Sequence, residues 1–135
     1  MVRLISICAS TDLILFRRNT VLIAKCKIPL KDLPRIENDN FFDDMIKAVV
    51  DIDLELISLS AEMHVDLESF MLENGSLQKN LYGINIYFEN GEIEFDSAIN
   101  PPRNRAAGYP RVGRYVADPQ VRNKIEEIVN KWIEL

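Results

Sequence analysis

The chain has a single histidine, His64, and an imidazole is the side chain best suited to proton transfer near neutral pH. If residues 62–66 end a strand, Glu62, His64 and Asp66 point to the same side. If a helix already includes His64, Glu68 lies one turn away. Either geometry would place an imidazole beside carboxylates, as general-base catalysis or metal binding requires. The favoured interpretation is structural: His64 forms a hydrogen bond within a strand-to-helix turn, and Asp66 caps the helix.

Carboxylates offer a second route to chemistry, through a divalent cation. Asp51, Asp66 and Asp96 could together bind Mg²⁺ or Ca²⁺, because hard cations prefer oxygen ligands. Zinc is not expected, since one histidine and two cysteines without ligand spacing do not make a zinc site. We therefore predict no metal and no cofactor. His64, Asp66 and Asp96 are kept as catalytic candidates of an enzymatic alternative.

Basic residues concentrate before the C-terminal helix. Residues 100–117 contain three Pro and two Gly, which is typical of a loop. Guanidinium groups here could bind a carboxylate-rich partner, including the acidic part of a second copy, and Asp96 could anchor the loop to the sheet. Tyrosines between the arginines would also suit nucleic acid. The predicted binding residues are Asn100, Arg103, Arg105, Arg111 and Arg114.

Charge is distributed unevenly along the chain, although the net charge is only −5. Residues 32–100 carry sixteen Asp and Glu against three Lys and Arg, whereas residues 101–122 carry five Arg against one Asp. Such a distribution permits complementary pairing within the fold or between copies. The acidic part repels phosphates, so nucleic acid is not the favoured partner. We expect a homo-oligomer, or an anionic ligand at the arginines.

Length and composition indicate a globular protein. With 135 residues, 47% hydrophobic and 27% charged, the chain is expected to form one domain over residues 1–135 with its own core. No apolar stretch approaches the ~20 residues that span a bilayer, so no membrane association is expected. Asp12 interrupts the N-terminal apolar run, which argues against a secretory signal peptide. Two cysteines are too few for a disulfide framework, and we predict a cytoplasmic protein.

Apolar periodicity predicts an α+β fold. The segments Leu81–Phe88 and Glu92–Ile99 alternate and flank Asn90-Gly91, the strongest short-range signal for a hairpin. Helices are expected over residues 30–41, from the Asp66 cap to Gly75, and from the Asp118 cap, with Pro119 first. We predict an antiparallel or mixed sheet with two or three helices packed on one face. Its other strands are expected at Leu4–Ile7, Leu13–Phe16, Val21–Cys26, Ile46–Ile52 and Leu54–Ala61, with a hairpin at the N-terminal edge.

Several short motifs resemble a small prokaryotic family that is known only as a domain of unknown function. They are KAVVDI at residues 47–52, H-x-D at 64–66, GS at 75–76, GIN at 83–85 and FDSAIN at 95–100. The resemblance covers about residues 22–135, so residues 1–21 are an added N-terminal piece. Tyr82 stands where the family usually has tryptophan, and residues 100–114 depart from its pattern. The resemblance implies a fold and a set of polar positions, but no reaction.

Three functions are therefore compatible with the sequence. The favoured one is an interaction module that self-associates or binds an anionic partner through its arginine-rich segment. The first alternative is a small metal-dependent hydrolase or nuclease-like enzyme that uses His64 with nearby carboxylates. The second is a nucleic-acid or nucleotide binder.

Overall fold

The computed structural model of the chain describes residues 3–7, 20–24, 26–36, 42–95, 116 and 118–134. Its helices are α1 (Leu33–Ile36), α2 (His64–Glu73) and α4 (Pro119–Trp132), and short 3₁₀ turns cover Leu30–Asp32 and Gln78–Asn80. Its strands are β1 (Arg3–Ile7), β2 (Thr20–Ala24), β3 (Ile28–Pro29), β4 (Met45–Asp51), β5 (Leu56–Leu59), β6 (Leu81–Tyr87), β7 (Ile93–Glu94) and β8 (Ile133–Glu134).

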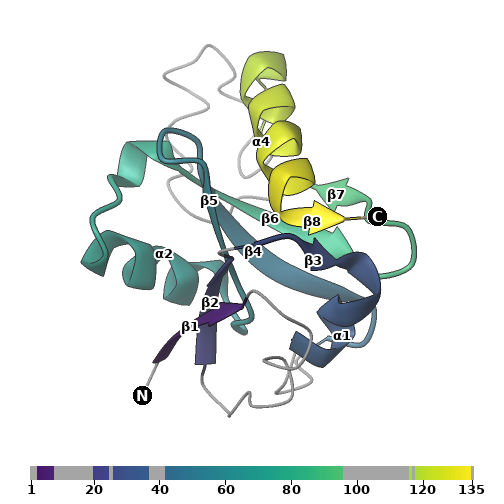
Figure 1. Cartoon of the computed structure of the whole chain (residues 1–135). Helices are drawn as coiled ribbons and strands as arrows, with labels where there is room; N and C mark the ends of the chain where they lie inside the picture. Colours follow the sequence, from purple (N-terminus) through teal and green to yellow (C-terminus); the bar gives the residue numbers. More distant parts are fainter. Residues whose placement is uncertain are drawn as a thin grey trace.

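The main sheet has the strand order β1-β2-β5-β4-β6-β7 (Figure 1). In this sheet β1 and β2 are parallel, and all the remaining neighbouring pairs are antiparallel. The longest described register joins β4 to β6, from Met45 opposite Tyr87 to Asp51 opposite Leu81. A second, parallel pair is formed by β3 and β8. The fold is therefore α+β with a mixed sheet, as the sequence predicted.

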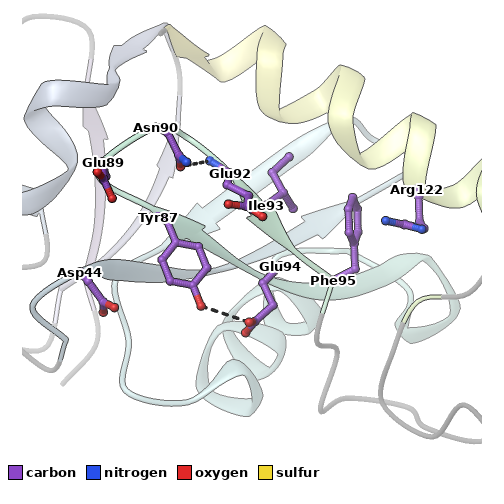
Figure 2. Close-up of a pocket in the computed structure, with 9 residues that line it drawn as sticks. All are labelled: Asp44, Tyr87, Glu89, Asn90, Glu92, Ile93, Glu94, Phe95 and Arg122. Atoms are coloured by element: carbon purple, nitrogen blue, oxygen red, sulfur yellow. Dashed lines mark hydrogen bonds between the residues drawn. The ribbon is translucent and has the colours of Figure 1, made fainter.

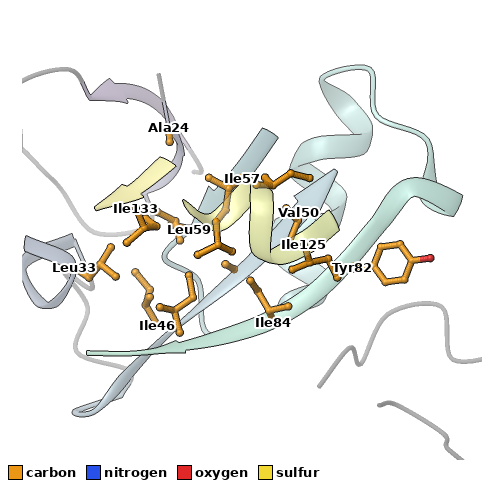
Figure 3. Close-up of a cluster of buried hydrophobic side chains, with 14 of the residues drawn as sticks. Ala24, Leu33, Ile46, Val50, Ile57, Leu59, Tyr82, Ile84, Ile125 and Ile133 are labelled. Carbon is orange, nitrogen blue, oxygen red and sulfur yellow. The ribbon is translucent and has the colours of Figure 1, made fainter. Parts of the chain in front are cut away.

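The two longer helices cover opposite faces of this sheet (Figure 1). Successive side chains of a strand point to opposite faces. Ala48 and Val50 of β4 belong to a buried cluster with Ile125 of α4 (Figure 3). Val49, between them, belongs to a second cluster with Met71 of α2. The apolar core is thus divided into two layers by the sheet.

This arrangement corrects the prediction that the helices pack on one face. Ala48, Val49 and Val50 are all fully buried, so β4 is apolar on both sides. Burying one such aliphatic side chain stabilises a fold by roughly 1.5–3 kcal/mol. Because β4 has apolar side chains on both faces, packed elements have to cover both faces of the sheet. A continuous apolar run is the pattern of a strand buried on both faces, and residues 48–50 already had that pattern.

The N-terminal strands β1 and β2 pair in parallel, so these two strands are not themselves the arms of the hairpin expected at this edge. The strand predicted at residues 13–16 lies outside the described residues. Cys26, just after β2, is disulfide-bonded. The strand expected at residues 54–61 is shorter, because residues 52–55 form the turn between β4 and β5.

The ends of the helices test the capping predictions. Asp118 caps α4 as predicted, since its Oδ1 accepts a hydrogen bond from the Gln120 backbone N–H at 2.9 Å, and Pro119 follows. The predicted cap of α2 is wrong, because α2 already begins at His64 and Asp66 lies exposed within its first turn. Gly75 ends α2 with φ +102°. Among the described helices, none is long and apolar enough to cross a membrane.

Candidate functional site

His64, the first catalytic candidate, is packed against β6. Its side chain is 2% exposed, and Nε2 lies 2.8 Å from the backbone oxygen of Ile84. A carbonyl oxygen only accepts, so Nε2 carries the proton and donates it. The ring lies directly on Gly83, because a Cβ there would be 2.9 Å from the His64 Cγ. The hydrogen bond expected within the strand-to-helix turn is therefore made across to the sheet.

Asp51, a candidate cation ligand, is fully buried at the end of β4. Its Oδ1 accepts hydrogen bonds from the backbone N–H groups of Asp53 and Leu54, both at 2.9 Å. Its Oδ2 accepts from the Ser76 hydroxyl at 2.6 Å. The carboxylate thereby ties the β4–β5 turn to the segment after α2. Its acceptors are occupied by neutral donors, as buried charges require.

The proposed catalytic set is not assembled within the described part of the chain. His64 is buried, whereas Asp66 is exposed on the first turn of α2. No group of three or more His, Cys, Asp or Glu side chains among the described residues could hold a metal ion. Asp96 and the predicted binding residues Asn100, Arg103, Arg105, Arg111 and Arg114 lie outside the described residues.

A different set of side chains surrounds a cavity of about 630 Å³ at the β6–β7 hairpin. Four of these side chains are carboxylates, and Figure 2 shows them distributed around Tyr87 and along β7. Because of this composition we name the cavity the acidic pocket. Its described lining consists of Asp44, Tyr87, Glu89, Asn90, Glu92, Ile93, Glu94, Phe95 and Arg122.

The hairpin that positions these groups follows from the predicted Asn-Gly turn. Gly91 has φ +74°, a conformation that suits glycine, and its N–H donates to the backbone carbonyl oxygen of Tyr87 at 2.9 Å. The Asn90 side chain accepts from the Glu92 N–H at 2.9 Å, which fixes the turn (Figure 2). The Phe88 N–H donates to the backbone carbonyl oxygen of Asp44 at 2.9 Å, so the segment before β4 lies beside the hairpin. These bonds bring Asp44 to the same pocket as the hairpin carboxylates.

The electrostatic environment of the pocket is negative. Glu94 accepts one hydrogen bond from the Tyr87 hydroxyl at 3.1 Å and another from the Asn85 amide at 2.7 Å. The hydrogen bond to Glu94, followed by the charge of Glu94 and smaller effects of Asp44 and Glu92, raises the pKa of Tyr87 above its ordinary value of 10.0. All four carboxylates are exposed, and none forms an ion pair within the described residues.

The cation of the pocket wall is held by an aromatic ring. The guanidinium carbon of Arg122 lies 4.5 Å from the centre of the Phe95 ring, next to β7 (Figure 2). The Phe95 oxygen also accepts from the Val116 N–H at 3.1 Å. Residues 95 and 116 therefore meet beside the pocket, and between them runs the sequence segment that carries four arginines.

None of the pocket residues was singled out as a site from the sequence. A signal was present, because Glu89, Glu92 and Glu94 surround the Asn90-Gly91 turn, where side chains must be exposed. Asp44 is separated from them by more than 40 residues, and only the pairing of β4 with β6 brings it near.

The fold and this pocket define an α+β protein with an acidic cavity at a hairpin. Comparison with protein families identifies it further: the model of the family described as "Protein of unknown function (DUF5674)" matches residues 22–132, and the chain belongs to this family. This agrees with the resemblance seen in the sequence. No curated protein and no solved structure matches the chain.

Proposed function

We propose that this protein is an interaction module that associates with a second copy of itself. In this proposal the acidic pocket of one copy receives arginines of segment 103–114 from another copy. The observation that carries it is the convergence of four exposed carboxylates, unpaired among the described residues, on one cavity. A group of like charges held at one place repels itself and attracts a cationic partner.

The charge distribution of the chain supplies the complement. Residues 103–114 contain four of the sixteen Lys and Arg residues of the chain and no Asp or Glu, so one sequence contains both partners of the contact. The pocket volume of about 630 Å³ is in the range of cavities that accept several side-chain atoms. Electrostatic contacts of this kind steer association and weaken as salt screens the charges. The other interaction to test is the binding of a free anionic ligand by the arginines.

The alternative functions receive less support from the described residues. The enzymatic alternative needs an accessible imidazole, and His64 is buried with Nε2 bound to a backbone oxygen. The nucleic-acid alternative needs a basic surface, and the described pocket is acidic. A prokaryotic setting is proposed from the family resemblance, and a cytoplasmic location is proposed from the sequence. The disulfide bond of Cys26 argues against that location, because a reducing cytoplasm rarely maintains such bonds.

A charge-swap experiment tests this proposal. Sedimentation velocity at low salt should show that the wild-type chain associates, and that association decreases as salt is added. Glu89→Lys with Glu92→Lys should abolish it, as should Arg103→Glu with Arg105→Glu. An equal mixture of the two variants should associate again, because each supplies the surface that the other lacks.

The matched control is Glu62→Lys with Glu73→Lys, which changes the net charge equally at two exposed positions outside the pocket lining. This control should associate nearly as the wild type does. A wild-type chain that stays monomeric at low salt at every concentration would overturn the proposal. A mixture that fails to associate would show that the two surfaces are not partners.

A further inference from the structure

We infer that the disulfide bond of Cys26 holds β1 on the edge of the main sheet, and that reduction of this bond releases β1. When β1 leaves, β2 becomes the edge strand, and its backbone N–H and C=O groups on that side are uncovered. The N-terminal edge of the sheet is therefore sensitive to the redox state. This inference goes beyond the proposed function, because it involves neither the acidic pocket nor the arginines of segment 103–114.

The first observation is that β1 is an addition to the sheet. Among the described strands β1 pairs with β2 alone. The part of the chain shared with the family begins at residue 22, within β2, so β1 lies outside it. β2 is held independently, because it also pairs with β5, and Ile23 and Ala24 are 4% and 0% exposed. These two side chains belong to the two different buried clusters. The sheet can therefore retain β2 when β1 leaves.

The second observation is the position of the two cysteines in the sequence. Cys8 is the only other cysteine, so a bond within the chain joins Cys26 to Cys8. The parallel register places Ile7 opposite Ala24. One cysteine follows directly after Ile7, and the other follows two positions after Ala24, so both come after the same end of the strand pair. Adjacent strands lie about 4.8 Å apart, which is compatible with the roughly 4.4–6.8 Å between the Cα atoms of a disulfide. The bond closes the strand pair at this end.

The third observation explains why the bond controls the strand. Without it, β1 is joined to β2 only by residues 8–19, near the minimum of about a dozen residues that can connect parallel strands. A disulfide that closes a loop of this length disfavours the open states by about a hundredfold or more. Thr20 and Val21 have register partners only on β1, whereas Leu22 and Ile23 also pair with β5. Release should therefore free the start of β2 and leave its end in the sheet.

The chemistry requires a dithiol as the reductant. Cys26 is partly exposed, so a thiolate can reach the bond. The thiolate attacks one sulfur, the S–S bond breaks, and the other cysteine leaves as a thiolate and takes up a proton. The second thiol of the reductant then displaces the remaining cysteine from the mixed disulfide. In total the dithiol loses two electrons and two protons and becomes a disulfide, and the chain gains two thiols.

Amide hydrogen exchange of the full-length protein, followed by NMR with and without dithiothreitol, tests the inference. High salt screens the association expected under the proposed function. The amide groups that bond β1 to β2 should exchange about a hundredfold faster in the reduced protein. Amides of β4 and β6 serve as the internal reference and should keep their protection. Cys8→Ser with Cys26→Ser should exchange as the reduced protein does, with or without dithiothreitol.

Each other outcome would overturn the inference at a different step. Two free thiols per chain after treatment with oxidised glutathione would show that the bond does not form. Equal exchange of the β1 and β2 amides in the oxidised and reduced protein would show that the bond does not hold the strand. Loss of protection in β4 and β6 on reduction would show that β1 is part of the cooperative core. None of these results bears on the proposed function, which depends on the pocket variants at low salt.

Discussion

The two polar regions of this fold differ in how their polar side chains are accommodated: one region buries them with hydrogen bonds, and the other exposes them. On the α2 side, His64 and Asp51 are buried and bonded to neutral groups of the protein. At the β6–β7 hairpin, the carboxylates are exposed and form no ion pair among the described residues. Burial of a charge is tolerated only when hydrogen bonds compensate it, whereas an exposed charge needs no partner. The residue types best suited to catalysis are thus buried and stabilise the fold here, whereas the exposed carboxylates are the groups that the proposed function assigns to a partner.

The largest effect that tests this comparison is expected at Asp51. Asp51→Ala removes the acceptor of three hydrogen bonds and leaves the N–H groups of Asp53 and Leu54 without their partner. Hydrogen bonds to a charged group contribute about 1.5–3 kcal/mol each and are not additive, so we expect a loss of roughly 3–4 kcal/mol. Urea denaturation measures it. Asp53→Ala, at an exposed neighbour, should change stability by less than about 0.5 kcal/mol. Equal effects of the two substitutions would show that the buried carboxylate is not structural.

The contact between His64 and Gly83 should give the next largest effect. Gly83→Ala places a Cβ 2.9 Å from the His64 Cγ, and such overpacking costs about 1–3 kcal/mol. His64→Ala should also destabilise, because it removes the bond to the Ile84 oxygen and leaves a cavity.

A double-mutant cycle distinguishes the contact from two independent losses. In the double variant the added methyl group meets no ring, so the combined loss in urea denaturation should be clearly smaller than the sum of the two single losses. Additive losses would contradict direct packing of the histidine on the glycine.

The comparison also explains which parts could be predicted from the sequence. The Asn90-Gly91 hairpin and the Asp118-Pro119 start of α4 follow from local chemistry, since each signal acts within a few residues. The placement of α2 and α4 on opposite faces depends on contacts between each helix and β4, and these contacts join residues that are distant in the sequence. The start of α2 was missed because Asp66 is a good capping residue type, yet the helix begins at His64, with Met63 at the cap position and no side-chain cap.

The candidate site was harder to predict for a similar reason. His64 and Asp51 have the right chemistry, but only the structure shows that their polar atoms are used by Ile84, Ser76 and the β4–β5 turn. The acidic pocket joins Asp44 to the hairpin through strand pairing, and no spacing along the chain indicates it.

A smaller effect on stability, with a large one on association, is expected in the pocket. Glu89→Gln with Glu92→Gln removes two exposed like charges, so the free energy of unfolding should change by less than about 0.5 kcal/mol. Sedimentation velocity at low salt should nevertheless show weaker association under the proposed function. A variant that unfolds as easily as Asp51→Ala would show that these carboxylates also support the fold, and the contrast between the regions would not hold.

The finest test is the titration of Tyr87. Glu94→Gln removes the carboxylate whose hydrogen bond and, second, whose charge raise the pKa of Tyr87, so this pKa should fall towards 10.0. The ¹³C shift of the tyrosine ring measures it, with Tyr87→Phe to assign the signal. The hydrogen bond to Glu94 requires the protonated phenol. Its stabilising contribution is therefore present below the ordinary pKa of about 10 and is lost as the pH rises through the higher pKa of the folded state. Glu73→Gln, outside the pocket lining, should leave the titration unchanged. If Glu94→Gln also left it unchanged, the negative field at the hairpin would not act on the groups inside the pocket, and a cationic partner would have no reason to prefer this face.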